Sequence, residues 1–243
     1  MATVESNTAR SRGPVEPDES TALDPYAMPV CVPTSALTHD GFRAWATSDS
    51  FPQFGRISFI DRTLVIEMSP EELETHNKLK TEIGSRVHLL GEDLDLGTYY
   101  SDGTLVTNES AELSTEPDGT FVTWASFRNG RVRLVPRKDE IGQYTELMGS
   151  PDWVLEVVSR SSYTKDTKLL REAYHRANVK EYWLVNALGD EIDFQILYHR
   201  RSGYARATPR DGWLRSRVFG SSFHLTRRRN RLGYWRYTLE IKQ

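Results

Sequence analysis

The strongest constraint on this fold is an almost uninterrupted apolar run, Trp153 to Ser159, followed by a helical pattern and a second apolar run. A run of this length after a turn residue such as Pro151 is typical of a strand buried on both faces. Apolar residues then recur at helical spacing from about Lys165 to Ala177, and Glu181 to Val185 predicts another strand. Strand, helix and strand in this order predict a crossover connection and a mixed sheet.

Size and cysteine content exclude several classes of protein. The chain has 243 residues, enough for one domain or two small ones with a core of moderate size. Its single cysteine, Cys31, cannot form an internal disulfide or the paired Cys-x-x-Cys sites of a zinc finger. No stretch approaches the ~18–20 apolar residues of a membrane span, and no basic and then apolar leader is present. We therefore expect a cytoplasmic protein with no membrane partner.

Composition predicts three segments along the chain. Residues 1–35 are rich in Ser, Thr, Pro and Glu without an apolar period, which predicts a disordered tail. Residues 36–197 hold the predicted strands and helices of the core. Residues 198–243 form a basic, strand-containing extension that we expect to pack on the core. Between Tyr198 and Arg236 there are eleven arginines and one acid, Asp211, a local charge of +10 in a chain of net charge −3.

The first part of the core predicts two hairpins and a helix. Arg56 to Asp61 and Leu64 to Met68 read as two strands around a short turn, and a second pair flanks the turn at Asp102 and Gly103. Between them Ser69 precedes Pro70 and two acids, the pattern of an N-cap and a first helical turn, and Gly91 is expected to end this helix. His76 fills a gap in that stripe, which places a polar side chain on the buried face of the helix.

Two acids, Asp118 and Glu156, belong to segments otherwise suited to burial. A buried carboxylate is costly unless it is paired or binds a cation. If the two converge at neighbouring strand ends, a divalent metal would relieve their repulsion, and hard oxygen ligands suit Mg²⁺ or Mn²⁺. Alternatively, Asp118 caps a turn and Glu156 pairs with an arginine or lysine. The residues alone leave both interpretations open.

Three stretches of the sequence together carry a family resemblance. They are Glu116-Pro117-Asp118, the run from Pro151 to Ser159, and the segment from Ala173 to Val185, which contains Glu-Tyr-Trp-Leu-Val. They resemble the Uma family of restriction-endonuclease-like proteins. Met68-Ser69-Pro70 with His76 adds to the likeness, which covers about residues 56–197. The resemblance implies an α/β (α+β) fold of the restriction-endonuclease type, with a mixed central sheet flanked by helices and here a strand-rich C-terminal extension.

The resemblance also implies the site residues. Asp118 is the first metal ligand and Glu156 the second, with Mg²⁺ or Mn²⁺ as the cofactor. The lysine of the general nuclease motif is expected two residues after Glu156, where this chain has Val158. In the Uma family the lysine lies on the following helix, so Lys165 and Lys168 are the candidates here; three residues apart, they are expected to share a helix face. Both also fit a solvated polar face.

Further positions are open to two interpretations. His76 is either a site residue or a core histidine with its hydrogen bonds satisfied. Glu67 and Glu72 are lesser site candidates, and Asp152 is expected to be a turn residue. Two departures from the family are Ser58, where relatives carry glutamate, and Arg62, where a turn glycine is usual.

These observations predict a metal-dependent nuclease that hydrolyses phosphodiester bonds by activating a water molecule, with DNA as the expected substrate. The alternative is a non-catalytic nucleic-acid-binding or scaffold protein that keeps the fold without the lysine. A homodimer is expected by analogy with nucleases of this fold. The candidate nucleic-acid contacts lie in the basic extension: Arg215, Arg217, Arg227, Arg228 and Arg229.

Overall fold

The computed structural model describes residues 30–137 and 140–243, so most of the predicted tail, residues 1–29, lies outside the described residues. All elements below belong to the unit Pro33–Gln243. The first is a 3₁₀ turn, η2 (Thr34–Leu37), followed by helix α1 (His39–Ala46).

A mixed sheet of six strands forms the centre of this unit. Its order is β12-β11-β10-β9-β6-β3. Strands β9 and β10 are parallel and every other pair is antiparallel, which confirms the predicted crossover and mixed sheet. The crossover contains a π-helical turn, η5 (Lys165–Leu169), and helix α4 (Leu170–Arg176). The strands are β3 (Gly97–Ser101), β6 (Gly119–Thr123), β9 (Trp153–Val157), β10 (Glu181–Asn186), β11 (Asp193–Arg200) and β12 (Gly203–Arg206).

A second sheet of six strands has the order β2-β1-β5-β4-β8-β7. The predicted hairpin of β1 and β2 is confirmed. The second predicted hairpin is wrong, because β3 pairs with β6 in the central sheet whereas β4 pairs with β5 and β8. The turn at Asp102 therefore carries the chain from one sheet to the other. The strands are β1 (Arg56–Ile60), β2 (Thr63–Glu67), β4 (Val106–Asn108), β5 (Leu113–Thr115), β7 (Val132–Pro136) and β8 (Tyr144–Gly149), with η4 (Glu109–Ala111) and α3 (Trp124–Arg128) between them.

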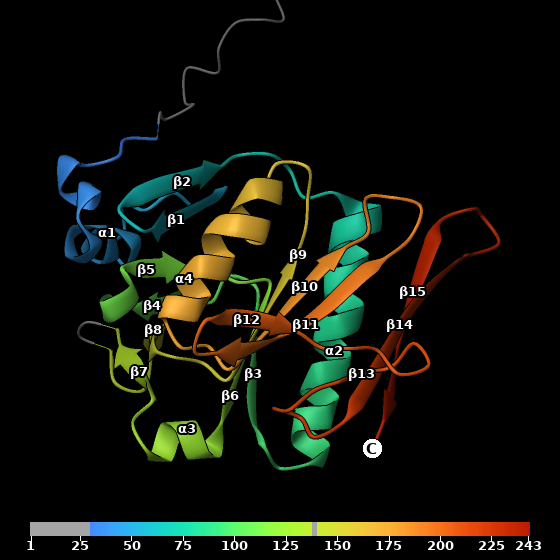
Figure 1. The fold of residues 1–243 in the computed structure, drawn as a ribbon. Coiled ribbons are helices and arrows are strands. Elements are labelled where there is room, and N and C mark those ends of the chain that lie inside the picture. The colour runs from blue at the N-terminus through green and yellow to red at the C-terminus, as the bar shows by residue number, and fades with distance from the viewer. Residues whose placement is uncertain (1–29, 138–139) are drawn as a thin grey trace, which may run out of the picture. The chain divides into compact units, whose positions relative to one another are not determined.

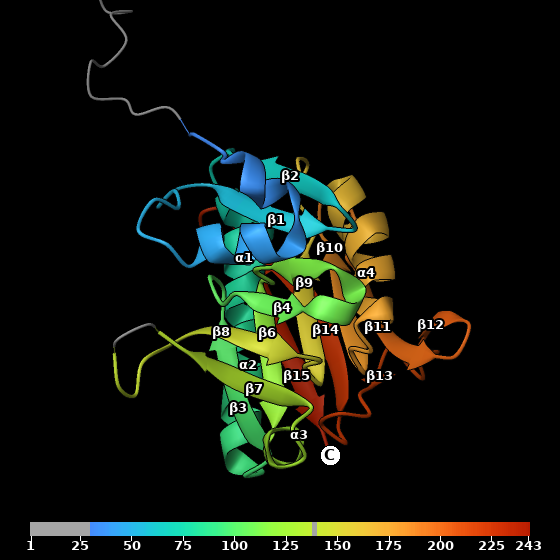
Figure 2. The same ribbon diagram turned by 90° about the vertical axis from the view of Figure 1, so that its left-hand side faces the viewer.

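Helices α2 and α4 lie on opposite faces of the central sheet (Figures 1 and 2). On one face, apolar residues of α2 (Lys78–Asp93) pack with Trp153, Trp183 and the C-terminal strands. On the other, Leu170 and Tyr174 of α4 pack with Val158 and with residues of the second sheet. Strand β9 is buried along its whole length, as its apolar sequence predicts.

The helix after Ser69 begins later than expected. Its first turn is a π-helical segment, η3 (Leu73–Asn77), and its N-cap is Glu72, whose carboxylate accepts hydrogen bonds from the N–H groups of Glu74 and Thr75. Ser69 is therefore not the cap. Helix α2 also continues through Gly91 to Asp93. A Cβ atom at Gly91 would lie 2.5 Å from the ring of Phe121, so this glycine permits close packing and does not end the helix.

The C-terminal strands β13 (Leu214–Arg215), β14 (Ser222–Arg229) and β15 (Trp235–Lys242) form a third sheet beside α2. Phe223 meets the ring of Trp183 edge to face, with centroids 4.7 Å apart. Glu74 and Glu82 accept hydrogen bonds from the N–H groups of Trp235 and Leu239. Strand β11 runs through residue 197, the predicted end of the core segment.

No helix within residues 30–137 and 140–243 is long and apolar enough to cross a membrane.

Candidate active site

The pairing of β6 with β9 brings the two predicted acids together. The ladder pairs Gly119 with Leu155, so Asp118 lies beside Glu156 at the next antiparallel position. The backbone N–H of Val157 donates to Oδ2 of Asp118 over 2.7 Å. Both carboxylates are only 1% exposed, and both line a pocket of about 730 Å³. Residues 38 positions apart in the sequence thus share one site.

Asp118 is surrounded by nitrogen atoms. Nη1 of Arg56 lies 3.0 Å from Oδ1, Nε2 of His76 lies 3.4 Å from Oδ2, and Nζ of Lys80 lies 3.9 Å from Oδ1. Burial alone would raise the pKa of this carboxyl, but the hydrogen bond and charge of His76, with Arg56 and Lys80, outweigh it and lower the pKa. Asp118 is therefore ionised at neutral pH.

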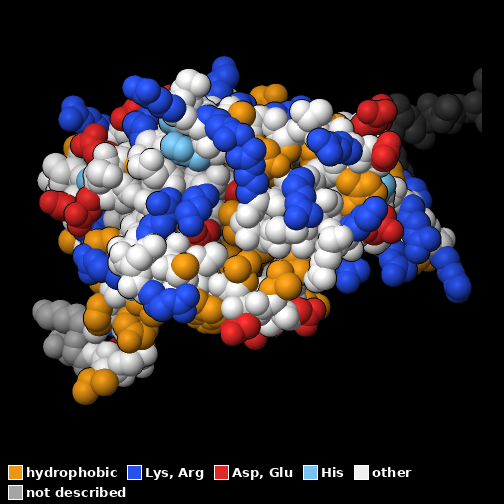
Figure 3. All heavy atoms as spheres, turned by 60° about the horizontal axis from the view of Figure 1, so that its bottom comes forward, with side chains coloured by type: hydrophobic (Ala, Val, Ile, Leu, Met, Phe, Trp, Pro, Cys, Tyr) orange, Lys and Arg blue, Asp and Glu red, His pale blue; other side chains and the backbone are white. Residues whose placement is uncertain are grey.

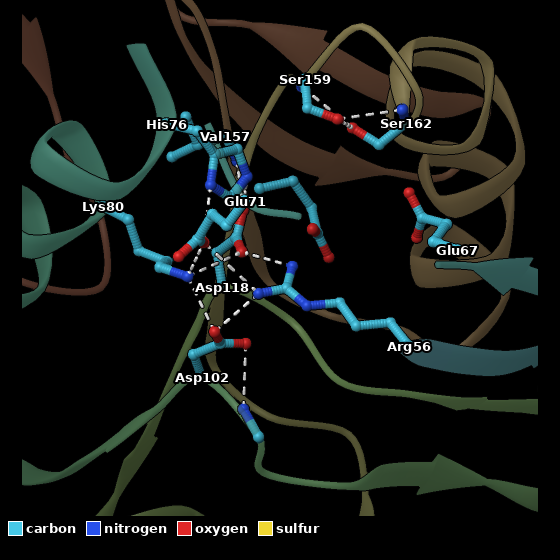
Figure 4. A network of polar contacts seen from close by, with 12 residues as sticks. Arg56, Glu67, Glu71, His76, Lys80, Asp102, Asp118, Val157, Ser159 and Ser162 are labelled. Carbon is cyan, nitrogen blue, oxygen red and sulfur yellow. Dashed lines mark hydrogen bonds and ion pairs between the residues drawn. The ribbon is translucent and has the colours of Figure 1, made fainter. Parts of the chain in front are cut away.

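The same cations reach two further acids (Figure 4). Arg56 and Lys80 both donate to Oδ2 of Asp102, over 2.6 and 2.7 Å. Lys80 also contacts Glu71, whose Oε1 lies 2.8 Å from Nδ1 of His76. Burial would lower the pKa of His76, but its hydrogen bond to Asp118 raises it on balance. His76 lines the pocket and is buried, and its Nδ1 makes no hydrogen bond of acceptable geometry with the described residues. This favours the site residue over a core histidine with its hydrogen bonds satisfied.

Glu156 faces the other side of the pocket. Its Oε1 accepts a 2.5 Å hydrogen bond from the hydroxyl of Tyr174 on α4. Burial and then the charge of Asp166 raise its pKa well above the ordinary value, against the charge of Lys165. Burial also raises the pKa of Asp166 to about 7. Oδ1 of Asp166 is buried and accepts no hydrogen bond from any residue in 30–137 or 140–243.

Of the two candidate lysines, the structure brings only Lys165 into the pocket. Its Nζ donates to Oε2 of Glu67 over 2.5 Å and lies 3.5 Å from Oδ1 of Asp166. Burial would lower its pKa, but the charges of Glu156 and Asp166 raise it. Lys168 is exposed and lines a separate hollow beside Arg171. The expectation of a shared face is wrong because η5 is a π turn, whose wider spacing separates positions three residues apart.

The remaining candidates lie around or outside the pocket. Glu67 and Glu72 line it, the first bound to Lys165 and the second capping η3. Asp152 is buried at a bend just before β9 and accepts hydrogen bonds from Thr123 N–H and Ser126 Oγ. Ser58 is buried against Thr115.

Position 158, where the general motif has lysine, is part of the core. Val158 is fully buried and belongs to the apolar cluster of Leu170 and Tyr174. Lys165 reaches the acids from η5, the element that follows β9. The positive charge of the motif is therefore present, although position 158 holds no lysine.

The five candidate arginines differ in what they contact. Arg227 and Arg229 lie over the ring of Trp235, and Arg217 lies over Tyr198. Arg227 also donates to the carbonyl groups of Ala187 and Gly189. Arg215 and Arg228 are exposed. Figure 3 shows Lys and Arg side chains scattered over one face of the molecule, without a single basic stripe.

Sequence reasoning missed several residues that line or support the pocket. The sequence predicts Arg56 only as part of a strand, Glu71 only as part of a first helical turn, and Asp166 only as part of a helix. Sequence patterns do not identify these residues, because the strand pairing that brings them beside the predicted acids joins segments that are far apart in the sequence. The missed residues are Arg56, Glu71, Lys80, Asp102, Arg160 and Asp166.

The donor set fits a divalent metal ion. Carboxylate oxygens are the ligands that Mg²⁺ and Mn²⁺ prefer. Asp118 and Glu156 are adjacent and buried, and burial first and the charges of Asp166 and Asp118 after it raise the pKa of Glu156, so a divalent ion would stabilise its ionised form. Oδ1 of Asp166 in the same pocket accepts no hydrogen bond from the described residues, although Nζ of Lys165 lies 3.5 Å away.

Comparison with known proteins defines the class of fold. One solved structure, titled as that of "a putative nuclease belonging to DUF820 from Anabaena variabilis ATCC 29413", is similar with a TM-score of 0.54. The sequences are 17% identical, and the match covers 75% of this chain and 90% of the other. The protein therefore has the fold of this nuclease-like structure.

A family model described as "Uma2: Putative restriction endonuclease" matches residues 40–227. The chain belongs to the Uma2 family, which confirms the resemblance seen in the sequence. No curated protein matches the chain.

Proposed function

We propose that this protein is a metal-dependent nuclease that hydrolyses phosphodiester bonds, with DNA as the expected substrate. The observation that carries the proposal is the β6–β9 ladder, which sets Asp118 beside Glu156 in a pocket of about 730 Å³ lined by Arg56, Arg160 and Lys165. Membership of the Uma2 family and the fold of the solved neighbour support a nuclease.

Asp118 and Glu156 would hold Mg²⁺ or Mn²⁺. When bound, the ion lowers the pKa of a coordinated water molecule and stabilises negative charge at the phosphate. Asp118 is ready to bind a cation because it is already ionised. Burial raises the pKa of Glu156, so a bound cation would favour its ionised form, and Tyr174 keeps its carboxyl group oriented through the hydrogen bond to Oε1.

Lys165 would supply the positive charge that the general motif places two residues after the glutamate. Its ammonium group is held by Glu67 and lies close to Asp166 at the side of the pocket where Glu156 is found. A fixed cation there stabilises the charge that develops on the phosphate, and it needs no reorganisation during the reaction.

The mouth of the pocket suits a polyanion with attached bases. Arg160 is exposed and lines the pocket with Ser159 and Ser161, so this loop offers a charge and hydroxyl groups to phosphate oxygens. Phe54 and Met68, 58% and 46% exposed, line the same pocket and provide apolar surface on which unpaired bases can stack.

The basic extension would add contacts with the phosphate backbone. Arg215, Arg217, Arg228 and Arg229 are exposed, but Arg217 and Arg229 lie over aromatic rings. We therefore assign contact first to Arg215 and Arg228. Two phosphate contacts would give a slope near −2 for log affinity against log salt concentration. The homodimer stays a prediction, which light scattering with and without duplex DNA would test.

Cleavage of supercoiled plasmid and of single-stranded DNA with Mg²⁺ or Mn²⁺ tests the proposal. Activity that is lost in both Asp118→Asn and Glu156→Gln is the expected result. If the native protein binds DNA without cutting it, the non-catalytic binding protein is the correct account. Activity that survives in both variants contradicts the proposed site.

A further inference from the structure

A second pocket lies at the opposite end of the central sheet from Asp118 and Glu156. It has a volume of about 450 Å³, and its walls include Asp152, just before β9, and Glu181, the first residue of β10. Glu156 follows Asp152 by four residues, about 13 Å along the strand. No described residue lines both pockets, and the function proposed above makes no use of this one.

The two acids of this second pocket are buried and already bound by donors of the chain. Asp152 accepts hydrogen bonds from Lys180 and from a backbone N–H and a hydroxyl group. Glu181 accepts hydrogen bonds from a hydroxyl group, an indole N–H and two backbone N–H groups. Both carboxylates are therefore occupied, and neither is left to pair with the arginines of the same pocket.

Two of the residues that line the pocket are arginines, Arg131 and Arg217. Within residues 30–137 and 140–243, the one ion pair across this pocket joins Lys180 to Asp152, so neither guanidinium group has a carboxylate partner. The guanidinium carbon of Arg217 lies 4.1 Å from the centroid of the Tyr198 ring. Two fixed positive charges thus remain available to a ligand.

Arg131 shows most clearly that an acceptor is missing. It is half-buried and donates through Nη2 to the carbonyl group of Asn178. Its Nε is buried and donates to no described residue. A buried donor without an acceptor costs free energy, and a bound anion would remove that cost.

The free donors fit a phosphomonoester group better than other anions. A phosphomonoester carries close to two negative charges at neutral pH and has three acceptor oxygens. Guanidinium groups bind phosphate oxygens through pairs of parallel hydrogen bonds. A carboxylate or a phosphodiester within a nucleic-acid backbone carries one charge and would balance only one of the two arginines.

We propose that this pocket binds a phosphomonoester group, with Arg131 and Arg217 as its main contacts and Lys180 beside them. The side chain of Lys180 is 50% exposed, and an ammonium group has three donors, so it can contact the ligand while it stays paired with Asp152. The phosphate group belongs either to a small metabolite, such as a mononucleotide, or to the end of a nucleic-acid strand. Both sources present the same chemistry to the pocket.

Calorimetric titration of the full chain with inorganic phosphate tests this site. EDTA removes divalent metal ions, so the result does not depend on the proposed nuclease centre, and NaCl keeps the ionic strength constant. The native protein is expected to bind phosphate. Arg131→Gln and Arg217→Gln should each weaken binding at least about tenfold, because each removes a charge-assisted hydrogen bond. Arg133→Gln, at an exposed arginine on β7, is the matched control and should bind as the native protein does.

Further titrations distinguish the two sources of the phosphate group. Deoxyadenosine monophosphate should bind and deoxyadenosine should not. If a 5′-phosphorylated oligonucleotide binds more tightly than the mononucleotide, and Arg131→Gln removes that gain, the ligand is a strand end. Without such a gain, the ligand is a small phosphomonoester.

Two results would overturn the proposal. One is a native protein that binds no phosphate. The other is native affinity in both Arg131→Gln and Arg217→Gln. Melting curves check that each variant is folded, and Arg217→Gln changes an exposed side chain, so it gives the answer if Arg131→Gln does not fold.

Discussion

The backbone N–H of Val157 donates to Oδ2 of Asp118 over 2.7 Å, and this bond ties the residue after Glu156 to the residue before β6. The position of the Asp118 carboxylate is therefore set by a strand backbone rather than by a loop. A site built on paired strands keeps its geometry better than one built on loops, which is what a metal centre requires.

Substitutions at Lys165 and Lys168 test which of the two lysines supplies positive charge to the pocket. We expect Lys165→Gln to lower the cleavage rate about 10²- to 10³-fold, because it removes a fixed cation beside the reacting phosphate. Lys168→Gln changes an exposed side chain outside the pocket and should cleave at the native rate. Single-turnover cleavage at saturating Mg²⁺ measures both. Equal losses in the two variants would refute the assignment of Lys165.

Tyr174 is expected to contribute to stability through Glu156. Tyr174→Phe leaves a buried carboxyl oxygen without its donor, which should lower the free energy of unfolding by about 1–3 kcal/mol. Tyr163→Phe, at a tyrosine that is 49% exposed, is the control and should change it by less than about 0.5 kcal/mol. Urea denaturation in EDTA measures both. A value for Tyr174→Phe within that smaller range would mean that the hydroxyl contributes nothing.

Glu181 predicts a pH dependence that is independent of the metal site. Burial raises its pKa above 4.5, against hydrogen bonds from Ser216, Arg217 N–H and Trp183. The folded state then binds more protons than the unfolded state, so stability falls as pH rises from about 4.5 through the folded-state pKa. Glu181→Gln has no proton to lose and should lack this fall.

Melting temperatures from about pH 4 to pH 7 measure the effect of Glu181. The stability of the native protein relative to Glu181→Gln should decrease across this range. Glu191→Gln, at an exposed glutamate, should keep the native dependence. Parallel curves for the native protein and Glu181→Gln would contradict the prediction.

Arg227 and Arg228 are adjacent but should act differently. Arg227 donates to the carbonyl groups on both sides of Leu188, a pocket residue, so Arg227→Ala should cost about 1.5–3 kcal/mol of stability. Arg228→Ala should change stability by less than about 0.5 kcal/mol and reduce the salt slope of DNA binding by about 0.9. Denaturation and binding titrations at several salt concentrations measure these effects. An unchanged slope in Arg228→Ala would remove this arginine from the DNA contacts.

Sequence patterns predicted the mixed sheet because its strands have strong local signals. Strand β9 and strand β10, which follows α4, are each predicted from a run of consecutive residues. The rule for crossover connections then places both strands in one sheet. The family resemblance likewise depends on short stretches that include Asp118 and Glu156. For these reasons the sequence alone predicts the fold and the two candidate acids.

The rest of the site depends on contacts between distant elements. Arg56 on β1, Lys80 on α2 and Asp102 after β3 meet only because two sheets and a helix converge there. Helical spacing failed for Lys168 because the π turn of η5 changes the face of each residue. Ser69 looked like a cap, yet the longer side chain of Glu72 reaches the free N–H groups of η3. No pattern of neighbouring residues in the sequence predicts these contacts.

The most direct test of the central claim is the rate of plasmid cleavage by the native protein, Asp118→Asn and Glu156→Gln, with Mn²⁺ binding measured on the same preparations. We predict that the native protein cuts DNA only with the metal, and that each variant loses cleavage together with at least one bound ion while it remains folded. Cleavage at the native rate by either folded variant would contradict the account.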